Sequence, residues 1–151
     1  MGILNVTPDS FSDGGKHQEL EQIVECARQM VRDGADIIDV GGESTRPGAA
    51  IVSKEEELQR VIPVIEALAR EISVPISIDT YKAEVAKAAV KAGASIINDI
   101  GGGRFDPDMP RVMAESKAYV ILMHNRQPDG ETMTVNQGNL TKYDNIVEDV
   151  L

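Results

Sequence analysis

Two hydrophobic patterns alternate along this chain. Five short apolar runs show no helical periodicity and end in turn or polar residues, and they lie at residues 1–4, 34–42, 74–80, 93–102 and 118–124. The longer stretches between them repeat apolar residues at i, i+3, i+4 and i+7, the spacing of one helix face. The second and fourth runs look like copies, since both begin Gly-Ala and end Gly-Gly. The pattern predicts strands of one kind alternating with amphipathic helices.

Capping residues indicate where the predicted helices begin and end. The clearest apolar stripe covers residues 20–31 and stops before a glycine. The next helix begins with a capping box, in which Ser53 is followed three residues later by Glu56. Pro63 lies inside that helix and is expected to kink or divide it. A shorter helix is predicted over residues 83–92.

A fourth helix is expected to follow Asp106, Pro107 and Asp108. Asp106 would cap this helix and Pro107 would occupy its first turn. Asp108 would lie beside the positive end of the helix dipole. The apolar face of the helix would include Met109 and Val112.

Alternating strands and helices imply a parallel sheet, which leaves a doubly wound sheet or a (β/α)8 barrel. No Gly-x-Gly-x-x-Gly or Walker pattern is present, so dinucleotide and P-loop sites are disfavoured. In a barrel the carboxyl ends of all strands face one shared site, and polar residues occupy every such end here. They are Asn5, residues 39–44, Asp79, Asn98 and His124. We therefore predict the α/β class with a (β/α)8 TIM-barrel type of fold.

The length predicts only part of such a barrel. A whole barrel needs roughly 250 residues, whereas this chain of 151 residues supplies strands 1–5 and helices 1–4. We expect residues 1–151 to form a single partial barrel domain that is truncated at both ends. Its first and fifth strands would be unpaired edges beside uncovered apolar faces, so we expect a homodimer or larger assembly, or a poorly packed state.

Composition and charge limit the kinds of partner that this chain is expected to bind. The net charge of −10 and the isoelectric point of about 4.6 argue against nucleic acid, because a phosphate backbone requires a basic footprint. No apolar run approaches the length of a membrane span, and no basic segment opens the chain, so we expect a cytoplasmic protein without membrane contact. Cys26 is the one cysteine and is expected to pack in the core.

The segment with the most side chains capable of binding a ligand follows the first strand, at residues 5–15. Pro8, Gly14 and Gly15 prevent a regular element there. Oxygen-bearing side chains crowd the same segment, namely Asn5, Thr7, Asp9, Ser10, Ser12 and Asp13. Such a loop is suited to a metal ion, a phosphate group, or both.

Residues 5–15, 41–48 and 78–82 resemble three motifs of dihydropteroate synthase in order and spacing, and 98–100 and 123–124 add two more. The resemblance runs through the whole chain. It implies a Mg²⁺-assisted transferase of folate biosynthesis, a sulfonamide target. The enzyme condenses 6-hydroxymethyl-7,8-dihydropterin diphosphate with 4-aminobenzoate and releases pyrophosphate. Its partners would be these small molecules.

The resemblance implies a role for each matching residue. Asn5 would offer an amide oxygen to Mg²⁺, although it could instead cap the turn. Asp79 and Asn98 would face each other and bind the pterin edge, with a helix cap as the alternative role of Asp79. Met123 would pack beneath the pterin ring. His124 is favoured as a structural or pocket-lining residue.

The two loops would supply the remaining contacts. Thr45 matches a diphosphate-binding position, and Arg46 would either bind phosphate oxygens or pair with a carboxylate of the first loop. Asp13 would stabilise a pterin-methyl cation formed when diphosphate leaves, so Asp13 and Arg46 are the expected catalytic residues. Phe11 and Pro47 would form apolar walls for 4-aminobenzoate.

Two other functions remain open at this stage. One alternative is a non-catalytic half-barrel that binds pterin weakly or not at all, since the later strands of the family carry further site residues. A folate- and corrinoid-dependent methyltransferase would share Asp79 and Asn98 but release no pyrophosphate. For Asp39, at the end of the second strand, a structural role is favoured.

Overall fold

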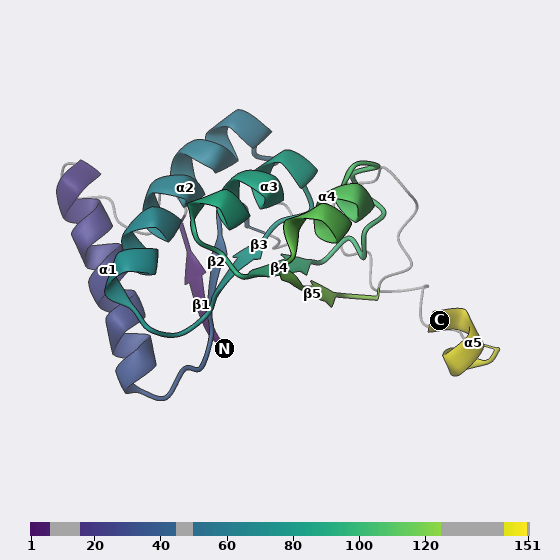
Figure 1. Cartoon of the computed structure of the whole chain (residues 1–151), viewed down its shortest axis with the longest axis horizontal. Helices are drawn as coiled ribbons and strands as arrows, with labels where there is room; N and C mark the ends of the chain where they lie inside the picture. The colour runs from purple at the N-terminus through teal and green to yellow at the C-terminus, as the bar shows by residue number, and fades with distance from the viewer. Residues whose placement is uncertain (7–15, 45–49, 125–143, 151) are drawn as a thin grey trace.

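The computed structural model describes residues 1–6, 16–44, 50–124 and 144–150. Strands and helices alternate along the chain, as predicted (Figure 1). The order is β1 (Gly2–Asn5), α1 (Lys16–Arg32), β2 (Ile38–Gly41), α2 (Lys54–Glu71), β3 (Ile76–Asp79), α3 (Ala83–Ala92), β4 (Ile96–Asp99), α4 (Met109–Ser116), β5 (Tyr119–Leu122) and α5 (Ile146–Val150).

The five strands form one parallel sheet in the order β1-β2-β3-β4-β5. Helices α1 to α4 lie along one side of this sheet (Figure 1). A doubly wound sheet would reverse its strand order at a switch point and would carry helices on both faces. Consecutive order with helices on one face is the arrangement of a (β/α)8 barrel, here partial. The predicted fold class is confirmed.

Alternation along each strand separates an apolar face from a polar one. The strand side chains that face the helices are buried and apolar, and they include Leu4, Ile38, Val40, Ile78 and Ile97. The register places polar residues on the opposite face, namely Asn5, Asp39, Ser77, Asp79 and Asn98. Cys26 is half-buried against the core, as expected.

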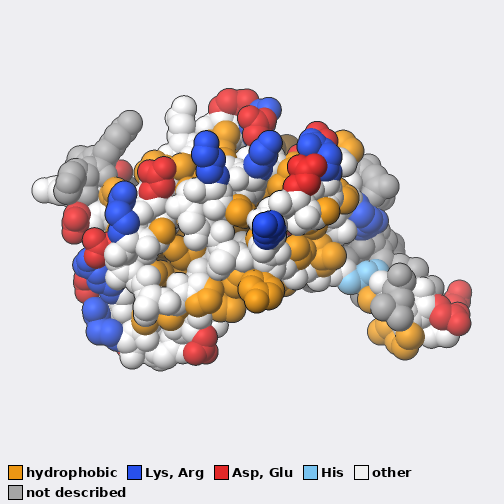
Figure 2. Space-filling model, viewed as in Figure 1, with side chains coloured by type: hydrophobic (Ala, Val, Ile, Leu, Met, Phe, Trp, Pro, Cys, Tyr) orange, Lys and Arg blue, Asp and Glu red, His pale blue; other side chains and the backbone are white. Residues whose placement is uncertain are grey.

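Apolar side chains are exposed at both edges of the sheet. Ile3 on β1 is 62% exposed, and Tyr119 and Leu122 on β5 are 80% and 56% exposed. Figure 2 shows charged side chains mainly over the helices, whereas hydrophobic atoms reach the surface along the lower side of the view. The predicted uncovered edges are therefore present, and the expected homodimer stays a prediction. Within the described residues, no helix is long and apolar enough to cross a membrane.

Two details of the helices differ from the sequence prediction. Ser53 caps α2 as expected, because its hydroxyl oxygen accepts from the backbone N–H of Glu56 at 3.2 Å. The division predicted at Pro63 is absent, and α2 runs through it as one helix. Pro63 lies on the exposed face, where water can reach the freed carbonyl, while Val61 and Val64 on either side are buried and hold both halves in the core.

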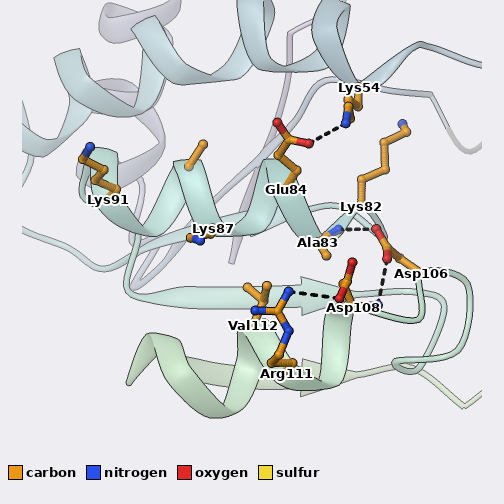
Figure 3. Close-up of a pocket in the computed structure, with 11 residues that line it drawn as sticks. Lys54, Lys82, Ala83, Glu84, Lys87, Lys91, Asp106, Asp108, Arg111 and Val112 are labelled. Atoms are coloured by element: carbon orange, nitrogen blue, oxygen red, sulfur yellow. Dashed lines mark hydrogen bonds and ion pairs between the residues drawn. The ribbon is translucent and has the colours of Figure 1, made fainter.

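The second difference concerns Asp106, whose side chain binds the start of α3 as well as the turn before α4, where its Oδ1 atom accepts from the backbone N–H of Asp108 at 3.0 Å. Its Oδ2 atom accepts from the backbone N–H of Ala83 at 2.8 Å, at the start of α3 (Figure 3). Helix α4 begins later, at Met109, and Pro110 instead of Pro107 lies in its first turn. The cap thus joins two neighbouring βα units, which a reading of local spacing cannot detect.

Two glycines that follow helices provide a matched test of packing. Gly34 and Gly93 have φ values of +100° and +127°, which disfavour any side chain. A Cβ atom at Gly34 would meet nothing within 4 Å, whereas one at Gly93 would lie 2.7 Å from the Cβ of Ala69 on α2. We expect Gly34→Ala to cost about 1 kcal/mol of unfolding free energy, and Gly93→Ala to cost about 1–3 kcal/mol more. Urea unfolding followed by circular dichroism measures both, and equal costs would contradict the close α2–α3 contact.

Candidate ligand site at the carboxyl ends of the strands

Three of the predicted site residues lie in one row across the sheet. The register pairs Asn5 with Gly41, Gly41 with Asp79, and Asp79 with Asn98. Each is the last or next-to-last residue of its strand. Parallel strands bring these positions to one edge, so residues 93 positions apart in sequence share one surface. The structure thereby brings together Asn5, Asp79 and Asn98.

Gly41 sets the spacing within this row. A Cβ atom at Gly41 would lie 3.6 Å from Oδ1 of Asn5 and 3.5 Å from Oδ2 of Asp79. The amide and the carboxylate therefore both lean over the glycine from their own strands. With no side chain between them, their oxygens share one open space. A larger residue at this position would fill that space.

A second polar pair lies on the same face. Asp39 on β2 is 4% exposed, and its Oδ2 atom accepts a hydrogen bond from the Asn98 Nδ2 group on β4 at 3.0 Å. The bond passes over β3, although neighbouring strands are about 4.8 Å apart. Contact between side chains two strands apart identifies this face as the concave one. It also matches barrel interiors, where alternate strands contribute to the same layer.

The concave face contains hydrogen-bonding groups without partners. Among the described residues, three buried side-chain atoms have no hydrogen bond, namely Asp39 Oδ1, Ser77 Oγ and Asp79 Oδ1. Each such atom costs about 1–3 kcal/mol when it is left unpaired. All three belong to neighbouring strands β2 and β3. A surface with this composition is suited to a ligand that donates several hydrogen bonds.

The electrostatics of Asp79 fit the same interpretation. Burial raises the pKa of the Asp79 carboxyl to about 7, and the carboxylates of Asp39, Glu57, Asp99 and Glu43 add to that rise. Strong perturbation of a partly buried acid is typical of functional sites. Asp79 therefore changes charge near neutral pH.

A network of charged side chains borders the row and was not predicted from the sequence. Lys82, at the N-cap of α3, pairs with Glu43 after β2 and with Glu57 on α2. Tyr81 donates its hydroxyl to Glu43 at 3.0 Å, and its ring packs edge-on against Phe105 at 5.8 Å. Glu57 is only 1% exposed, and Lys82 is the cation that pairs with its buried carboxylate. The network fixes the residues that follow β2 and β3 against α2.

The chain after β4 is held by Asp99, whose side chain lies on the helix face. Its two carboxylate oxygens accept from the backbone N–H groups of Gly101 and Gly103, both at 2.7 Å. Gly102 between them has a φ of +62°, and a Cβ atom there would lie 3.0 Å from the carbonyl oxygen of Met123. The turn requires glycine for both reasons.

The other predicted site residues lie after β5 or outside the described part of the chain. Met123 follows β5 and is 41% exposed, with its backbone N–H donating to the Asp99 carbonyl at 3.1 Å. His124 is exposed beside it. Five predicted residues lie outside the described part of the chain, namely Phe11, Asp13, Thr45, Arg46 and Pro47. The described residues contain no group of three His, Cys, Asp or Glu side chains that could hold a metal ion.

A separate groove of about 630 Å³ lies on the helix side, between α3 and α4. Lys87 and Lys91 project from α3, and Arg111 projects from α4 (Figure 3). Three acidic residues, Glu84, Asp106 and Asp108, also line it. No predicted site residue belongs to this groove. The candidate site is therefore the concave face at the strand ends.

A partial parallel barrel with a polar site at its strand ends defines an α/β ligand-binding protein. The chain belongs to the family of pterin binding enzymes, which matches residues 1–151. The resemblance to dihydropteroate synthase is confirmed as well. The chain is 64% identical over 126 residues to the dihydropteroate synthase of Bacillus subtilis, covering 83% of this chain and 44% of that protein.

Solved structures agree with this assignment. The dihydropteroate synthase of Clostridium difficile, determined in the presence of pteroic acid, superposes with a TM-score of 0.83 at 51% identity, covering 99% of this chain and 52% of that one. The Xanthomonas albilineans synthase with 4-aminobenzoic acid gives a TM-score of 0.79 at 46% identity, covering 99% and 50%. This chain spans about half the length of the relatives it matches.

The raised pKa of Asp79 predicts a pH-dependent stability. Between pH 3.8 and about 7 the folded chain holds a proton on Asp79 that the unfolded chain releases, so the unfolding free energy falls as pH rises through this window. Asp79→Asn removes that loss and should make the variant more stable than the parent at pH 8, by at most on the order of 4 kcal/mol. At pH 4 the two proteins should differ little.

Urea unfolding at a series of pH values tests this expectation. Asp36→Asn is the matched control, because Asp36 is exposed and makes no described contact with the site. Its difference from the parent should not grow with pH. A pH-independent difference for Asp79→Asn would show that Asp79 is not buried as described.

Proposed function

We propose that this chain supplies the pterin-binding half of a dihydropteroate synthase, which joins 6-hydroxymethyl-7,8-dihydropterin diphosphate to 4-aminobenzoate. One observation carries the proposal: a buried Asp79 oxygen without a partner lies in register with Asn98, at the strand ends of a chain from this family. The names and ligands of the matching synthases support it further.

A pterin suits the concave face because its flat ring carries N–H donors beside ring acceptors. Asp79 would accept from adjacent N–H groups, while the Asn98 amide would accept from another. Pairing these groups would relieve the cost of the unpaired Asp79 oxygen. Met123 would contact the ring face from the adjoining strand.

The diphosphate would extend toward β1 and the two loops. We propose that Thr45 and Arg46 bind its oxygens, since a hydroxyl and a guanidinium match phosphate geometry. Asn5 fits the role of a Mg²⁺ ligand, because its amide oxygen points over Gly41 into open space. Mg²⁺ commonly takes one or two protein oxygens and completes its shell with phosphate and water. When bound there, it would neutralise negative charge on the leaving group.

The reaction would proceed by ionisation. The bond between the pterin methylene carbon and the diphosphate oxygen breaks, and the electron pair leaves with diphosphate. The nitrogen lone pair of 4-aminobenzoate then forms the new C–N bond, and that nitrogen loses a proton to solvent. Asp13 would stabilise the cation and Arg46 the departing anion. Phe11 and Pro47 would hold the arylamine in place.

Further properties belong to the same proposal. We infer a cytoplasmic homodimer from the resemblance. The exposed β5 edge favours a second possibility for the 151-residue chain on its own, a half-barrel that binds pterin without turnover. Catalysis should therefore be measured in a restored barrel, a chimera in which this chain replaces the half of the Clostridium difficile synthase on which it superposes.

The first functional prediction concerns Asp79. In the restored barrel, Asp79→Ala should abolish measurable binding of the pterin diphosphate, because each donor on the ligand left unpaired costs roughly 1–3 kcal/mol. Titration calorimetry provides the measurement, and Asp36→Ala is the control that should bind normally. Affinity within twofold of the parent would remove Asp79 from the site. An unsubstituted restored barrel that binds pterin but releases no pyrophosphate with 4-aminobenzoate would contradict the synthase assignment.

The second functional prediction separates the two substrates. Phe11→Leu, or Pro47→Ala, should raise the Michaelis constant for 4-aminobenzoate and leave binding of the pterin diphosphate nearly unchanged, because both residues are assigned to the arylamine pocket. Steady-state pyrophosphate release measures the first quantity and calorimetry the second. A selective loss of pterin affinity would refute the assignment.

A further inference from the structure

Asp39 is a buried carboxylate to which the proposed function gives no role. It lies on β2, two residues before Gly41, and its side chain faces the concave side of the sheet. One of its oxygens binds the Asn98 amide and the other has no partner among the described residues. A residue needed only for packing would be apolar at this position, because an unpaired buried acceptor destabilises the fold.

The bond to Asp39 determines which end of the Asn98 amide meets a ligand. An asparagine amide has a donating NH₂ group and an accepting oxygen, and the two differ little in shape. A carboxylate only accepts hydrogen bonds, so the NH₂ group of Asn98 must be the end that points to Asp39. The amide oxygen then points away from Asp39, and Asn98 is presented as an acceptor beside Asp79.

We propose that Asp39 is a positioning residue, an inference that rests on the proposed function. Asp39 fixes Asn98 as a hydrogen-bond acceptor. The site therefore selects for a ligand edge whose donors face both Asp79 and Asn98. Without Asp39, Asn98 could rotate by 180° about its last bond and offer an N–H group to a ligand donor. Asp39 acts through Asn98.

The charge of Asp39 also affects Asp79. After burial, the Asp39 carboxylate is the largest contributor to the raised pKa of Asp79, ahead of Glu57, Asp99 and Glu43. The orientation of Asn98 and the charge effect on Asp79 can thus be separated by two substitutions of Asp39. Asp39→Asn keeps an acceptor oxygen for Asn98 but removes the charge. Asp39→Leu keeps the branching at Cγ and removes both.

The test measures affinity for 6-hydroxymethyl-7,8-dihydropterin diphosphate in the restored barrel by calorimetry, from pH 5.5 to 8.5. At pH 8.5, Asp39→Leu should weaken binding by about tenfold or more, since an amide in the wrong orientation loses a hydrogen bond. Asp39→Asn should stay within about threefold of the parent. In Asp39→Asn the midpoint of the pH dependence should move to lower pH, because Asp79 ionises more readily. The titration of the ligand is common to all variants and cancels in the comparison.

A double-mutant cycle separates positioning from general structural damage. In an Asn98→Ala background, Asp39→Leu should cost less than about threefold, because the residue it orients is already absent. Thermal unfolding identifies any variant that fails to fold, and Asp39→Ala, which also removes the acceptor for Asn98, then replaces Asp39→Leu in the cycle.

The outcomes are distinct. Equal losses for Asp39→Leu with and without Asn98 would overturn the positioning role, whereas an unchanged pH midpoint in Asp39→Asn would overturn the effect of the Asp39 charge on Asp79. Failure of the unsubstituted restored barrel to bind the pterin diphosphate would instead overturn the proposed function itself.

Discussion

The concave face of this sheet must satisfy its own polar groups, and that constraint governs the site. The helices lie on the other face, where Ile38, Val40 and Ile78 are fully buried in an apolar core. Because successive side chains alternate between faces, a strand that begins in the core must direct its next residue inward. Asp39 and Asp79 are such residues. Their hydrogen-bonding requirements are met across strands or by a ligand.

Stability and binding therefore compete on this surface. The unpaired oxygens of Asp39 and Asp79 and the hydroxyl of Ser77 destabilise the ligand-free fold by about 1–3 kcal/mol each. Surrounding structure holds them in place nonetheless. The ion pairs of Lys82 with Glu43 and Glu57 anchor the strand ends on one side, and the two backbone bonds to Asp99 anchor the turn after β4. Rigid neighbours preorganise polar groups that a flexible site would turn toward water.

Much of the architecture was readable from the sequence because it depends on local spacing. Apolar runs and helical stripes gave the strands and α1 to α3, and the rule that strand ends converge placed Asn5, Asp79 and Asn98 together. Interactions between distant segments could not be predicted from the sequence. Asn98 and Asp39 are 59 residues apart and Lys82 and Glu43 are 39 apart, and no periodicity links such pairs. The bond from Asp106 to α3 and the continuity of α2 through Pro63 were missed for the same reason, since neighbouring elements determine both.

The consecutive strand order has a consequence for how the chain acquires its structure during synthesis. Each strand pairs with the strand that precedes it in the sequence, so a new βα unit always meets a partner that has already left the ribosome. Within the described sheet, no strand after β1 must wait for a distant segment, and the entropy of loop closure stays that of one crossover. The sheet can grow by one unit at a time, with the most recent strand as its temporary edge.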